Sequence, residues 1–271
     1  DQFAQEKLDA LERRALRRRL AATERRAEAE TARFDATGTP RSLISFCCND
    51  YLNLSQHPEV KAAAAEAAVR HGAGAGASRL VTGNHPLYDA LEARLAAFKG
   101  TEAAVVFGSG YLANLGIIPS LVGPEDLIAV DALSHACLHA GSVLARSTVR
   151  VYRHNDVDAL DSILAAERDS FRHALIVTDG VFSMDGDLAP LERLTEVATR
   201  HDAWLMTDDA HGIGVLGDGR GSTCAATQRA TGPVHVPLQM GTLSKPVGSY
   251  GRYPRAAQPV VDLINTRART L

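Results

Sequence analysis

Residues 174–207, ALIVTDGVFSMDGDLAPLERLTEVATRHDAWLMT, decide the fold class of this chain. The apolar runs Ala174–Thr178 and Ala203–Thr207 at the two ends are typical of buried strands, and Leu191–His201 between them has helical spacing. A strand, a helix and a second strand in this order predict a βαβ unit. Its two strands are expected to be parallel, joined by a right-handed crossover.

The same alternation runs through the chain from about residue 43 onward. Further strands are expected at Ala103–Phe107, Leu127–Val130, Val149–Tyr152 and Val236–Met240, and further helices at Pro86–Phe98, Tyr111–Leu121, His135–Ala145 and Val157–Glu167. Apolar strands alternating with amphipathic helices predict an α/β fold with a mostly parallel sheet, covered by helices on both faces. Ligands of such sheets bind beyond the carboxyl ends of the strands, so we expect functional residues in the loops there.

The first 35 residues have a different pattern. A thin apolar stripe among many charged residues predicts one long helix, and its members are Leu8, Leu11, Leu16 and Leu20. The basic cluster Arg13, Arg14, Arg17, Arg18 and Arg19 is either a solvated helix face or an anion contact. Asp35–Pro40 indicates a turn. We therefore expect an N-terminal helical segment over residues 1–48 and a larger domain over residues 49–271.

The composition excludes several classes of protein. With 271 residues, 45% of them hydrophobic and 23% charged, the chain has the make-up of a globular protein rather than a disordered or collagen-like one. A formal net charge of −3 argues against a basic nucleic-acid-binding surface. We expect no membrane span and no secretory signal, since long apolar runs are lacking. Four irregularly spaced cysteines do not predict a disulfide framework or a zinc site, which favours a cytoplasmic location.

A glycine-flanked turn, Gly108-Ser109-Gly110-Tyr111, follows the predicted strand at residues 103–107 and opens a helix. Backbone N–H groups and the positive end of the dipole at a helix start bind phosphate, and the Ser109 hydroxyl adds a donor. A plain strand–helix turn is the alternative interpretation. A nucleophilic serine is disfavoured, because the second glycine lies too close for the G-x-S-x-G pattern.

Asp208-Asp209-Ala210-His211 ends the predicted strand at residues 203–207. A carboxylate placed there can hold a ring nitrogen in its protonated form by charge pairing. A metal site is an alternative, but a second cluster of ligands is lacking in the sequence. The next residues, Gly212–Gly217, match the dinucleotide pattern GxGxxG, yet Asp218–Ser222 continues as a loop where that pattern requires a helix. A nicotinamide dehydrogenase rests on this match alone.

Lys245 ends the glycine-flanked segment Gly241-Thr-Leu-Ser-Lys245, which follows the predicted strand at residues 236–240. A desolvated lysine amine has a lowered pKa, which suits Schiff-base chemistry; an exposed loop lysine is the alternative. A phosphate cradle, a carboxylate for a ring nitrogen and an amine for an aldehyde are the three requirements of pyridoxal 5′-phosphate (PLP). The three motifs, each at the end of a predicted strand, together predict PLP as the cofactor.

Seven segments spread over nearly the whole chain resemble the α-oxoamine synthase family of PLP enzymes. They are Asn49–Leu54, Ala77–Pro86, Gly108–Asn114, Asp131–Ala136, Asp179–Asp187, Asp208–Gly212 and Gly241–Lys245. Of these, Ala77–Pro86 is most similar to the members of the family that act in biotin synthesis. The resemblance implies a fold-type-I PLP transferase large domain over residues 49–271, in a homodimer with active sites at the subunit interface.

The resemblance also implies three catalytic residues. Lys245 would form the Schiff base with PLP and move the α-proton of the amino acid. Asp208 would pair with the pyridinium nitrogen and keep the ring an electron sink. His135 would stack on the ring and assist the acid chemistry near the substrate.

The other matching residues are expected to bind the cofactor or the substrate. The phenolic oxygen of PLP would be contacted by His211 and Ser183. The phosphate would be held by Ser109, Gly110, Tyr111 and Thr242. The substrate would be contacted by Arg17 and Asn49, together with His135.

The activity implied by the resemblance is a decarboxylative condensation of L-alanine with a pimeloyl thioester, in biotin biosynthesis. The acyl carrier would be coenzyme A (pimeloyl-CoA) or a carrier protein, and the products an amino ketone, carbon dioxide and a free thiol. Two alternatives stay open: condensation of glycine or serine with a different acyl-CoA, and a cofactor-binding fragment without turnover. No metal, nucleic acid or membrane is expected as a partner.

Three features depart from the family pattern. The family continues beyond Arg267–Leu271 into a small C-terminal domain with an arginine for the amino-acid carboxylate, so we expect that domain to be absent. Pro246 follows the lysine where a small residue is usual, and proline removes a backbone donor. Arg252-Tyr-Pro-Arg255 replaces a smaller and more apolar stretch. We expect both changes to alter the surroundings of Lys245.

Overall fold

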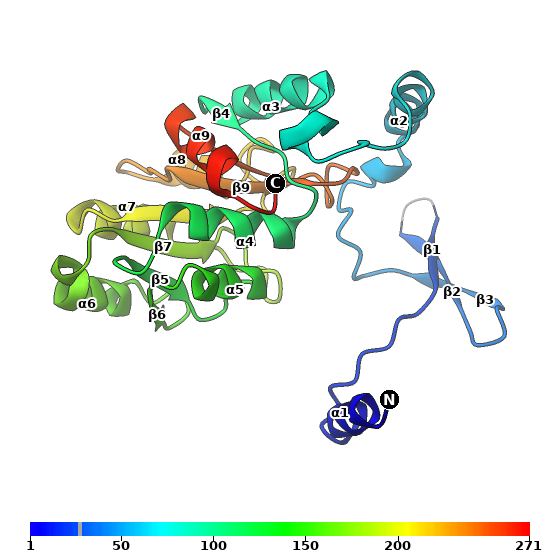
Figure 1. Cartoon of the computed structure of the whole chain (residues 1–271), viewed down its shortest axis with the longest axis horizontal. Helices are drawn as coiled ribbons and strands as arrows, with labels where there is room; N and C mark the ends of the chain where they lie inside the picture. Colours follow the sequence, from blue (N-terminus) through cyan, green and yellow to red (C-terminus); the bar gives the residue numbers. More distant parts are fainter. Residues whose placement is uncertain (27–28) are drawn as a thin grey trace. The chain divides into compact units, whose positions relative to one another are not determined.

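The computed structural model describes residues 1–26 and 29–271 of the chain. It divides into two compact units, Asp1–Cys48 and Asn49–Leu271, and each is described here by itself (Figure 1). Among the described residues, no helix combines the length and the apolar character needed to cross a membrane.

The prediction of one long helix over residues 1–35 is wrong. Helix α1 covers only Gln2–Arg13, and the chain turns at Ala15, whose φ is 53°. An antiparallel sheet follows, made of β1 (Thr23–Arg25), β2 (Glu30–Phe34) and β3 (Pro40–Ile44). Residues 27 and 28, also within the predicted helix, lie outside the described residues.

The physical reason for the short helix is a lack of buried surface. Helix α1 buries none of its side chains, so packing does not stabilise further turns, and isolated helices are marginal in water. Strand pairing instead buries Thr31 and Ala32 of β2. The turn at residues 35–40 occurs as predicted: the Asp35 carboxylate accepts the N–H groups of Thr37 and Thr39, each at 2.9 Å. The N-terminal segment is therefore mixed α and β rather than helical.

A seven-stranded sheet forms the centre of the second unit. Its members are β4 (Ala103–Ala104), β5 (Leu127–Asp131), β6 (Thr148–Tyr152), β7 (Ala174–Asp179), β8 (Trp204–Asp208), β9 (Leu238–Thr242) and β10 (Arg252–Ala256). The strand order is β4-β10-β9-β8-β7-β5-β6. Strands β5 to β9 are parallel, whereas β10 runs antiparallel to both β4 and β9. This arrangement confirms the predicted α/β fold with a mostly parallel sheet.

Helices cover both faces of this sheet (Figure 1). They are α3 (Pro86–Lys99), α4 (Gly110–Leu121), α5 (Ala136–Leu144), α6 (Val157–Glu167), α7 (Leu191–Arg200), α8 (Ser222–Arg229) and α9 (Gln258–Arg267). Helix α2 (Pro58–His71), which precedes them in the chain, buries none of its side chains. Alternate residues of β5 pack against different helices, because successive side chains of a strand point to opposite faces. Ile128 and Val130 belong to a core with α4, α5 and α9, while Leu127 and Ala129 belong to one with α6 and α7.

The edge of the sheet differs from the sequence prediction. The strand expected at Ala103–Phe107 is reduced to two residues, β4, and Phe107 forms only an isolated bridge with Arg252. Its partner β10 was not predicted, because Arg252, Pro254 and Arg255 do not read as a buried strand. All five residues of β10 are nevertheless buried.

Candidate active site

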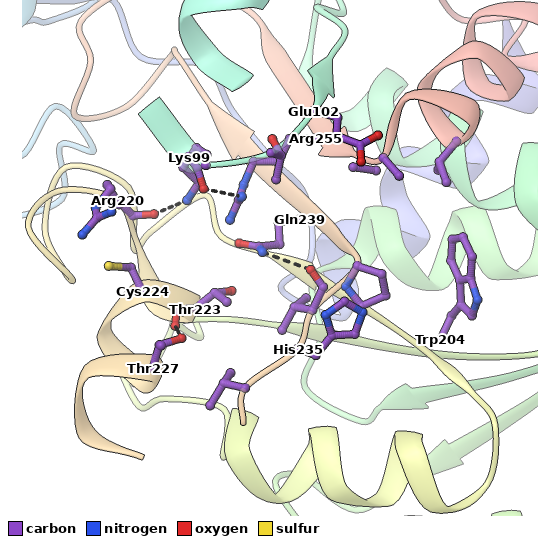
Figure 2. A pocket seen from close by; sticks show the side chains of 18 of the residues that line it. Lys99, Glu102, Trp204, Arg220, Thr223, Cys224, Thr227, His235, Gln239 and Arg255 are labelled. Atoms are coloured by element: carbon purple, nitrogen blue, oxygen red, sulfur yellow. Dashed lines mark hydrogen bonds between the residues drawn. The ribbon is translucent and has the colours of Figure 1, made fainter. Parts of the chain in front are cut away.

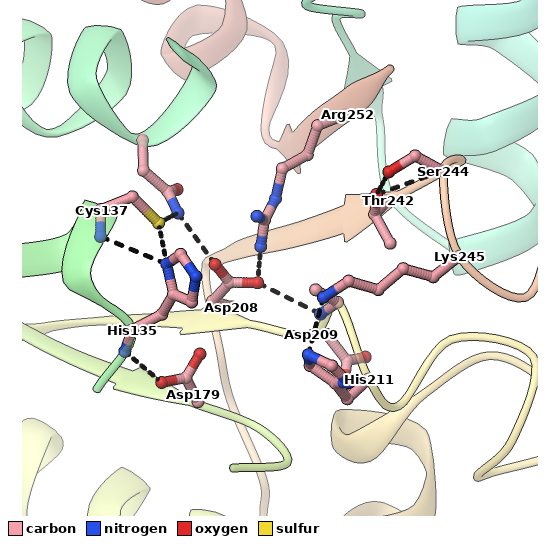
Figure 3. A network of polar contacts seen from close by, with 12 residues as sticks. His135, Cys137, Asp179, Asp208, Asp209, His211, Thr242, Ser244, Lys245 and Arg252 are labelled. Atoms are coloured by element: carbon pink, nitrogen blue, oxygen red, sulfur yellow. Dashed lines mark hydrogen bonds and ion pairs between the residues drawn. The ribbon is translucent and has the colours of Figure 1, made fainter. Parts of the chain in front are cut away.

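The carboxyl ends of four parallel strands bring the predicted catalytic residues together (Figure 3). His135 lies four residues after the end of β5, Asp179 ends β7, Asp208 ends β8 and Lys245 follows β9. Strands that run parallel end at the same edge of a sheet, which is why residues far apart in the sequence meet here. The fold thus brings these residues to one edge of the sheet, and their roles stay predictions.

Asp208 is a buried carboxylate at the centre of this cluster, 1% exposed. Its Oδ2 accepts a hydrogen bond from the side-chain amide of Asn114 at 2.8 Å, and its Oδ1 accepts the N–H of Ala210 at 3.1 Å. Oδ1 also pairs with the guanidinium of Arg252. Because a buried carboxylate is costly without a positive partner, this position requires a cation.

A chain of hydrogen bonds leads from Lys245 to the surface. Nζ of Lys245 lies 2.6 Å from Nε2 of His211, and Nδ1 of His211 lies 2.6 Å from the hydroxyl of Tyr51. The Tyr51 hydroxyl donates to Oδ1 of Asn49 at 3.1 Å. This direction assigns the proton of a neutral His211 to Nδ1, leaving Nε2 as acceptor for the lysine.

Burial and neighbouring cations favour the uncharged forms of these bases. Burial lowers the pKa of Lys245, with Asp179 opposing the shift. Burial, and then the positive charge of Lys245, lower the pKa of His211 to about 4. A neutral His211 beside an amine of lowered pKa is the environment expected for a lysine nucleophile.

His135 is fixed by its own helix and by the neighbouring strand. It is the N-cap of α5, where its Nδ1 accepts the N–H of Cys137 at 3.2 Å. Its backbone N–H donates to Oδ2 of Asp179 at 2.7 Å. Burial lowers the pKa of the imidazole, with Arg252 and Lys245 adding to the shift. The ring is therefore neutral near pH 7.

The glycine turn forms the N-terminus of helix α4. Ser109 is the N-cap, and its hydroxyl accepts the N–H of Leu112 at 3.2 Å, so it acts as a cap rather than a nucleophile. The N–H groups of Gly110 and Tyr111 have no partner within the helix, because a helix leaves its first donors unsatisfied. Thr242, at the end of β9, is buried and lies 2.9 Å from the hydroxyl of Ser244.

Arg252 lies inside the cluster. Its side chain extends from β10 to Asp208, with His135 on one side and Lys245 on the other (Figure 3). The residue is 5% exposed, and burial lowers its pKa to about 10. A Cβ atom added at Gly110 would lie 2.7 Å from its Nη1, so the guanidinium spans the distance between the acid and the glycine turn.

One predicted site residue, Ser183, lies outside this cluster, and another, Arg17, belongs to the other unit. Arg17 belongs to the first unit, where it forms an ion pair with Glu12 at 3.5 Å. Ser183 lies exposed in the turn between Val181 and Leu188. Their roles in substrate and cofactor binding stay predictions.

Sequence reasoning missed four residues of the cluster: Asn114, Asp179, Tyr51 and Cys137. Asp179 was detectable, since it follows a buried strand as Asp208 does. Burial raises the pKa of its carboxyl group to about 7. The amide of Asn114 carried no signal, because its contacts with Asp208 and with the sulfur of Cys137 join distant parts of the chain.

A second buried charge pair stands behind the site. Nζ of Lys99 lies 3.3 Å from Oδ2 of Asp209, and both side chains are completely buried. Both carboxylate oxygens of Asp209 also accept the N–H of Ser222, at 3.0 and 3.1 Å. This pair anchors the segment after Asp208 to the end of helix α3.

Lys99 also lines a cavity of about 1070 Å³ (Figure 2). The cavity includes Trp204 at the start of β8 and Arg255 near the end of β10. It therefore opens toward the other end of the parallel strands, and none of the predicted catalytic residues line it.

The structure gives no support to two alternative interpretations. Within residues 1–26 and 29–271, no group of three or more His, Cys, Asp or Glu side chains is arranged to hold a metal ion. The segment Gly212–Gly217 continues as a loop, and the next helix, α8, begins at Ser222. A dinucleotide fingerprint requires a helix that starts at the last glycine.

Comparison with known proteins shows the family of this chain. Residues 41–269 match the family described as aminotransferase class I and II. A putative 8-amino-7-oxononanoate synthase from Parvibaculum lavamentivorans is 62% identical over 272 residues, covering 100% of this chain and 68% of that protein. The 8-amino-7-oxononanoate synthase of Beijerinckia indica is 59% identical over 274 residues, with the same coverage.

Solved structures show the same fold. Serine palmitoyltransferase from S. paucimobilis, with a bound PLP–myriocin aldimine, is 30% identical and has a TM-score of 0.84, covering 98% of this chain and 65% of that one. The 8-amino-7-oxononanoate synthase from Francisella tularensis is 26% identical and has a TM-score of 0.65, covering 83% and 61%. The chain thus spans about two thirds of the length of these relatives.

The fold and the converging residues define a PLP-dependent transferase of fold type I. The chain belongs to the aminotransferase class I and II family. Its residues fit PLP in donor type: an amine for the aldehyde, a buried carboxylate for the ring nitrogen and a helix N-terminus for the phosphate. One feature does not fit, since the carboxylate already carries Arg252.

Proposed function

We propose that this protein condenses L-alanine with a pimeloyl thioester to give 8-amino-7-oxononanoate, carbon dioxide and a free thiol, in biotin biosynthesis. The observation that carries the proposal is the meeting of Lys245, Asp208 and His135 at one edge of the sheet. High identity to 8-amino-7-oxononanoate synthases supports this choice among PLP-dependent reactions.

PLP, when bound, supplies an aldehyde for Schiff-base formation and a protonated ring that accepts electron density. Lys245 would bond to the aldehyde, because burial lowers the pKa of its amine and so favours the uncharged, nucleophilic form. The same Nζ would also move the α-proton of the amino acid. His211, 2.6 Å away and neutral, accepts a hydrogen bond from Nζ and so orients it.

Asp208 would hold the ring nitrogen in its protonated form, since a buried carboxylate strongly favours a positive partner. Asn114 fixes the carboxylate by donating to Oδ2, which turns Oδ1 toward the site. His135, held by Asp179 through its backbone N–H, offers a neutral imidazole face for stacking on the ring. Gly110 and Tyr111 provide N–H donors for the phosphate.

We also infer a homodimer in the cytoplasm. Family resemblance supports the dimer, with Arg17 and Asn49 contacting the acyl substrate. The free thiols of three cysteines support a reducing compartment: Cys47 is exposed, Cys137 is buried and Cys224 is partly buried.

Absorbance tests the cofactor part of the proposal. The chain incubated with PLP should show a visible absorption band that borohydride abolishes and fixes covalently. Lys245→Ala should lose the band, and Lys61→Ala, on exposed helix α2, should keep it. A wild-type protein that stays colourless and cannot be reduced would remove the cofactor assignment.

Thiol release tests the substrate part. L-alanine with pimeloyl-CoA should release free thiol, and carrier-bound pimelate serves as the second donor. Serine with palmitoyl-CoA and glycine with a short acyl-CoA test the alternative condensations. Faster release with either pair than with alanine and pimelate would contradict the proposed substrates, and release with none would favour a fragment that binds PLP without turnover.

A further inference from the structure

Arg252 is a buried cation that the proposed reaction does not use. It lies on β10, is 5% exposed and pairs with Oδ1 of Asp208. Its Nε, also buried, makes no hydrogen bond with any part of the chain that the structure describes. An arginine that is buried and only partly satisfied in this way is expensive, so its contact with the carboxylate is what holds it in place.

Each oxygen of the Asp208 carboxylate already has a partner, and one of these partners is a cation. Oδ2 is occupied by the Asn114 amide at 2.8 Å, and Oδ1 by the N–H of Ala210 at 3.1 Å and by Arg252. A pyridinium N–H needs a short contact with this carboxylate. With the guanidinium present it would meet a like charge, at a distance where repulsion is strong in a buried site.

The same guanidinium also narrows the path to the glycine turn. A Cβ atom added at Gly110 would lie 2.7 Å from Nη1 and 3.1 Å from Cδ of Arg252, so the side chain passes directly over this residue. His135 and Lys245 flank its head in Figure 3. The arginine therefore stands where the ring has to lie between these two residues.

We propose that Arg252 competes with the pyridine ring of PLP for Asp208, so that cofactor loading requires the exchange of one cation for another on this carboxylate. This proposal depends on the proposed function in one respect, which is that PLP is the cofactor. Nη1 of Arg252 already lies close to Gly110 at the N-terminus of α4, where a phosphate would be a suitable new partner for the guanidinium.

The consequence is a reduced apparent affinity for the cofactor. When a site is open in only a fraction of the molecules, the apparent association constant of its ligand is reduced to that fraction of its intrinsic value. Arg252→Met removes the charge and keeps much of the side-chain volume. We expect it to bind PLP at least tenfold more tightly than the wild-type chain.

Arg255→Met is the matched control. Arg255 is buried on the same strand and its Nη1 donates to the backbone carbonyl of Lys99 at 2.9 Å. Because it lies three residues from Arg252, it points to the other face of β10. Its loss is expected to lower the stability of the chain and to leave the dissociation constant for PLP within threefold of the wild-type value.

The experiment is a PLP titration followed by absorbance and by protein fluorescence, with thermal unfolding of each protein without PLP as a second readout. Without PLP, Arg252→Met should melt lower than the wild-type chain, because Asp208 has lost its counter-ion. Saturating PLP should raise its melting temperature more than that of the wild type. Arg252→Lys keeps a positive charge near Asp208 and should therefore fold even if Arg252→Met does not. A lysine ammonium makes fewer contacts with the carboxylate than a guanidinium, so we expect this variant to bind PLP at least threefold more tightly than the wild type.

The outcomes separate this inference from the proposed function. Equal or weaker PLP binding by both Arg252 variants, with normal binding by the wild-type chain, would overturn the competition and leave the PLP assignment intact. Tighter binding by the Arg252 variants but not by Arg255→Met supports it. Absence of PLP binding in all of these proteins, at concentrations where they are folded, would overturn both.

Discussion

The buried pair of Lys99 and Asp209 offers the sharpest test of what stabilises this site. Lys99→Met would keep the apolar stem of the side chain and remove its charge. The carboxylate of Asp209, completely buried, would then retain the N–H of Ser222 but have no cation within contact distance among the described residues. Glycines at 212 and 221 pack so closely on its oxygens that a Cβ at either would clash.

The magnitude follows from the cost of an unpaired buried charge. Removing one partner of a buried ion pair costs about 3–5 kcal/mol in the free energy of unfolding. For a domain of this size, this corresponds to a fall in melting temperature of about 10 °C. Asp209→Asn alone should cost less, because the buried lysine can lose its proton.

Urea unfolding of the wild type, both single variants and the double variant Lys99→Met/Asp209→Asn completes the cycle. The double variant should be more stable than Lys99→Met, since no charge is left unpaired. A loss below about 1 kcal/mol in Lys99→Met would refute the reasoning, and so would a double variant no more stable than that single variant.

The pair also predicts a pH dependence. Burial lowers the pKa of Lys99 from 10.5 to about 8, so the folded chain binds fewer protons than the unfolded chain between these values. Stability should therefore rise with pH from about 8 to 10.5. Between about pH 8 and 10.5, the unfolding free energy of the wild type should rise more steeply with pH than that of Lys99→Met. Equal slopes in the two proteins would contradict this prediction.

Three further predictions concern other buried polar groups. Burial raises the pKa of Asp179 to about 7, so ionisation of this carboxyl group destabilises the fold as pH rises from about 4 to 7. The variant Asp179→Asn can still accept the N–H of His135, and urea unfolding at pH 8 should show it to be more stable than wild type by up to about 4 kcal/mol. Equal stability of the two proteins would contradict this. Arg79→Ala should lower the free energy of unfolding by about 2–4 kcal/mol in the same assay, because Arg79 pairs with the half-buried Glu92 at 2.6 Å. A loss below about 0.5 kcal/mol, the value typical of an exposed ion pair, would contradict this prediction. Burial lowers the pKa of His154, but the carboxylates of Asp131 and Asp187 outweigh it and the net shift is upward. The substitution His154→Gln should therefore reduce stability more at pH 5.5 than at pH 9. Thermal unfolding that gives the reverse order would contradict this prediction.

Much of the fold was predictable because the central strands are mostly apolar. Strands β5, β7 and β9 are buried along their whole length, as is β8 after its first residue, and such strands read as hydrophobic runs between helical segments. The first 35 residues have no such signal. There, the stripe of leucines indicated a helix, whereas pairing between β1, β2 and β3 determined the structure.

The site was predictable where chemistry follows the end of a strand. Lys245, Asp208 and His135 each stand in that position, and the structure places them in one cluster. Contacts between distant segments gave no signal in the sequence. Arg252 was recognisable as an unusual residue, but only the antiparallel pairing of β10 with β9 places its guanidinium on Asp208.

The pairing of β4 with β10 also affects how the chain is made. Arg255 and Lys99, which hydrogen-bond across this edge, are 156 residues apart. At ribosomal rates of 5–20 residues per second, the earlier segment waits about 8–30 s before its partner emerges. Until then, the apolar side chains of α3 and β4 that pack against β10 remain exposed and accessible to chaperones. The site around Asp208 is likewise incomplete until β10 has been synthesised.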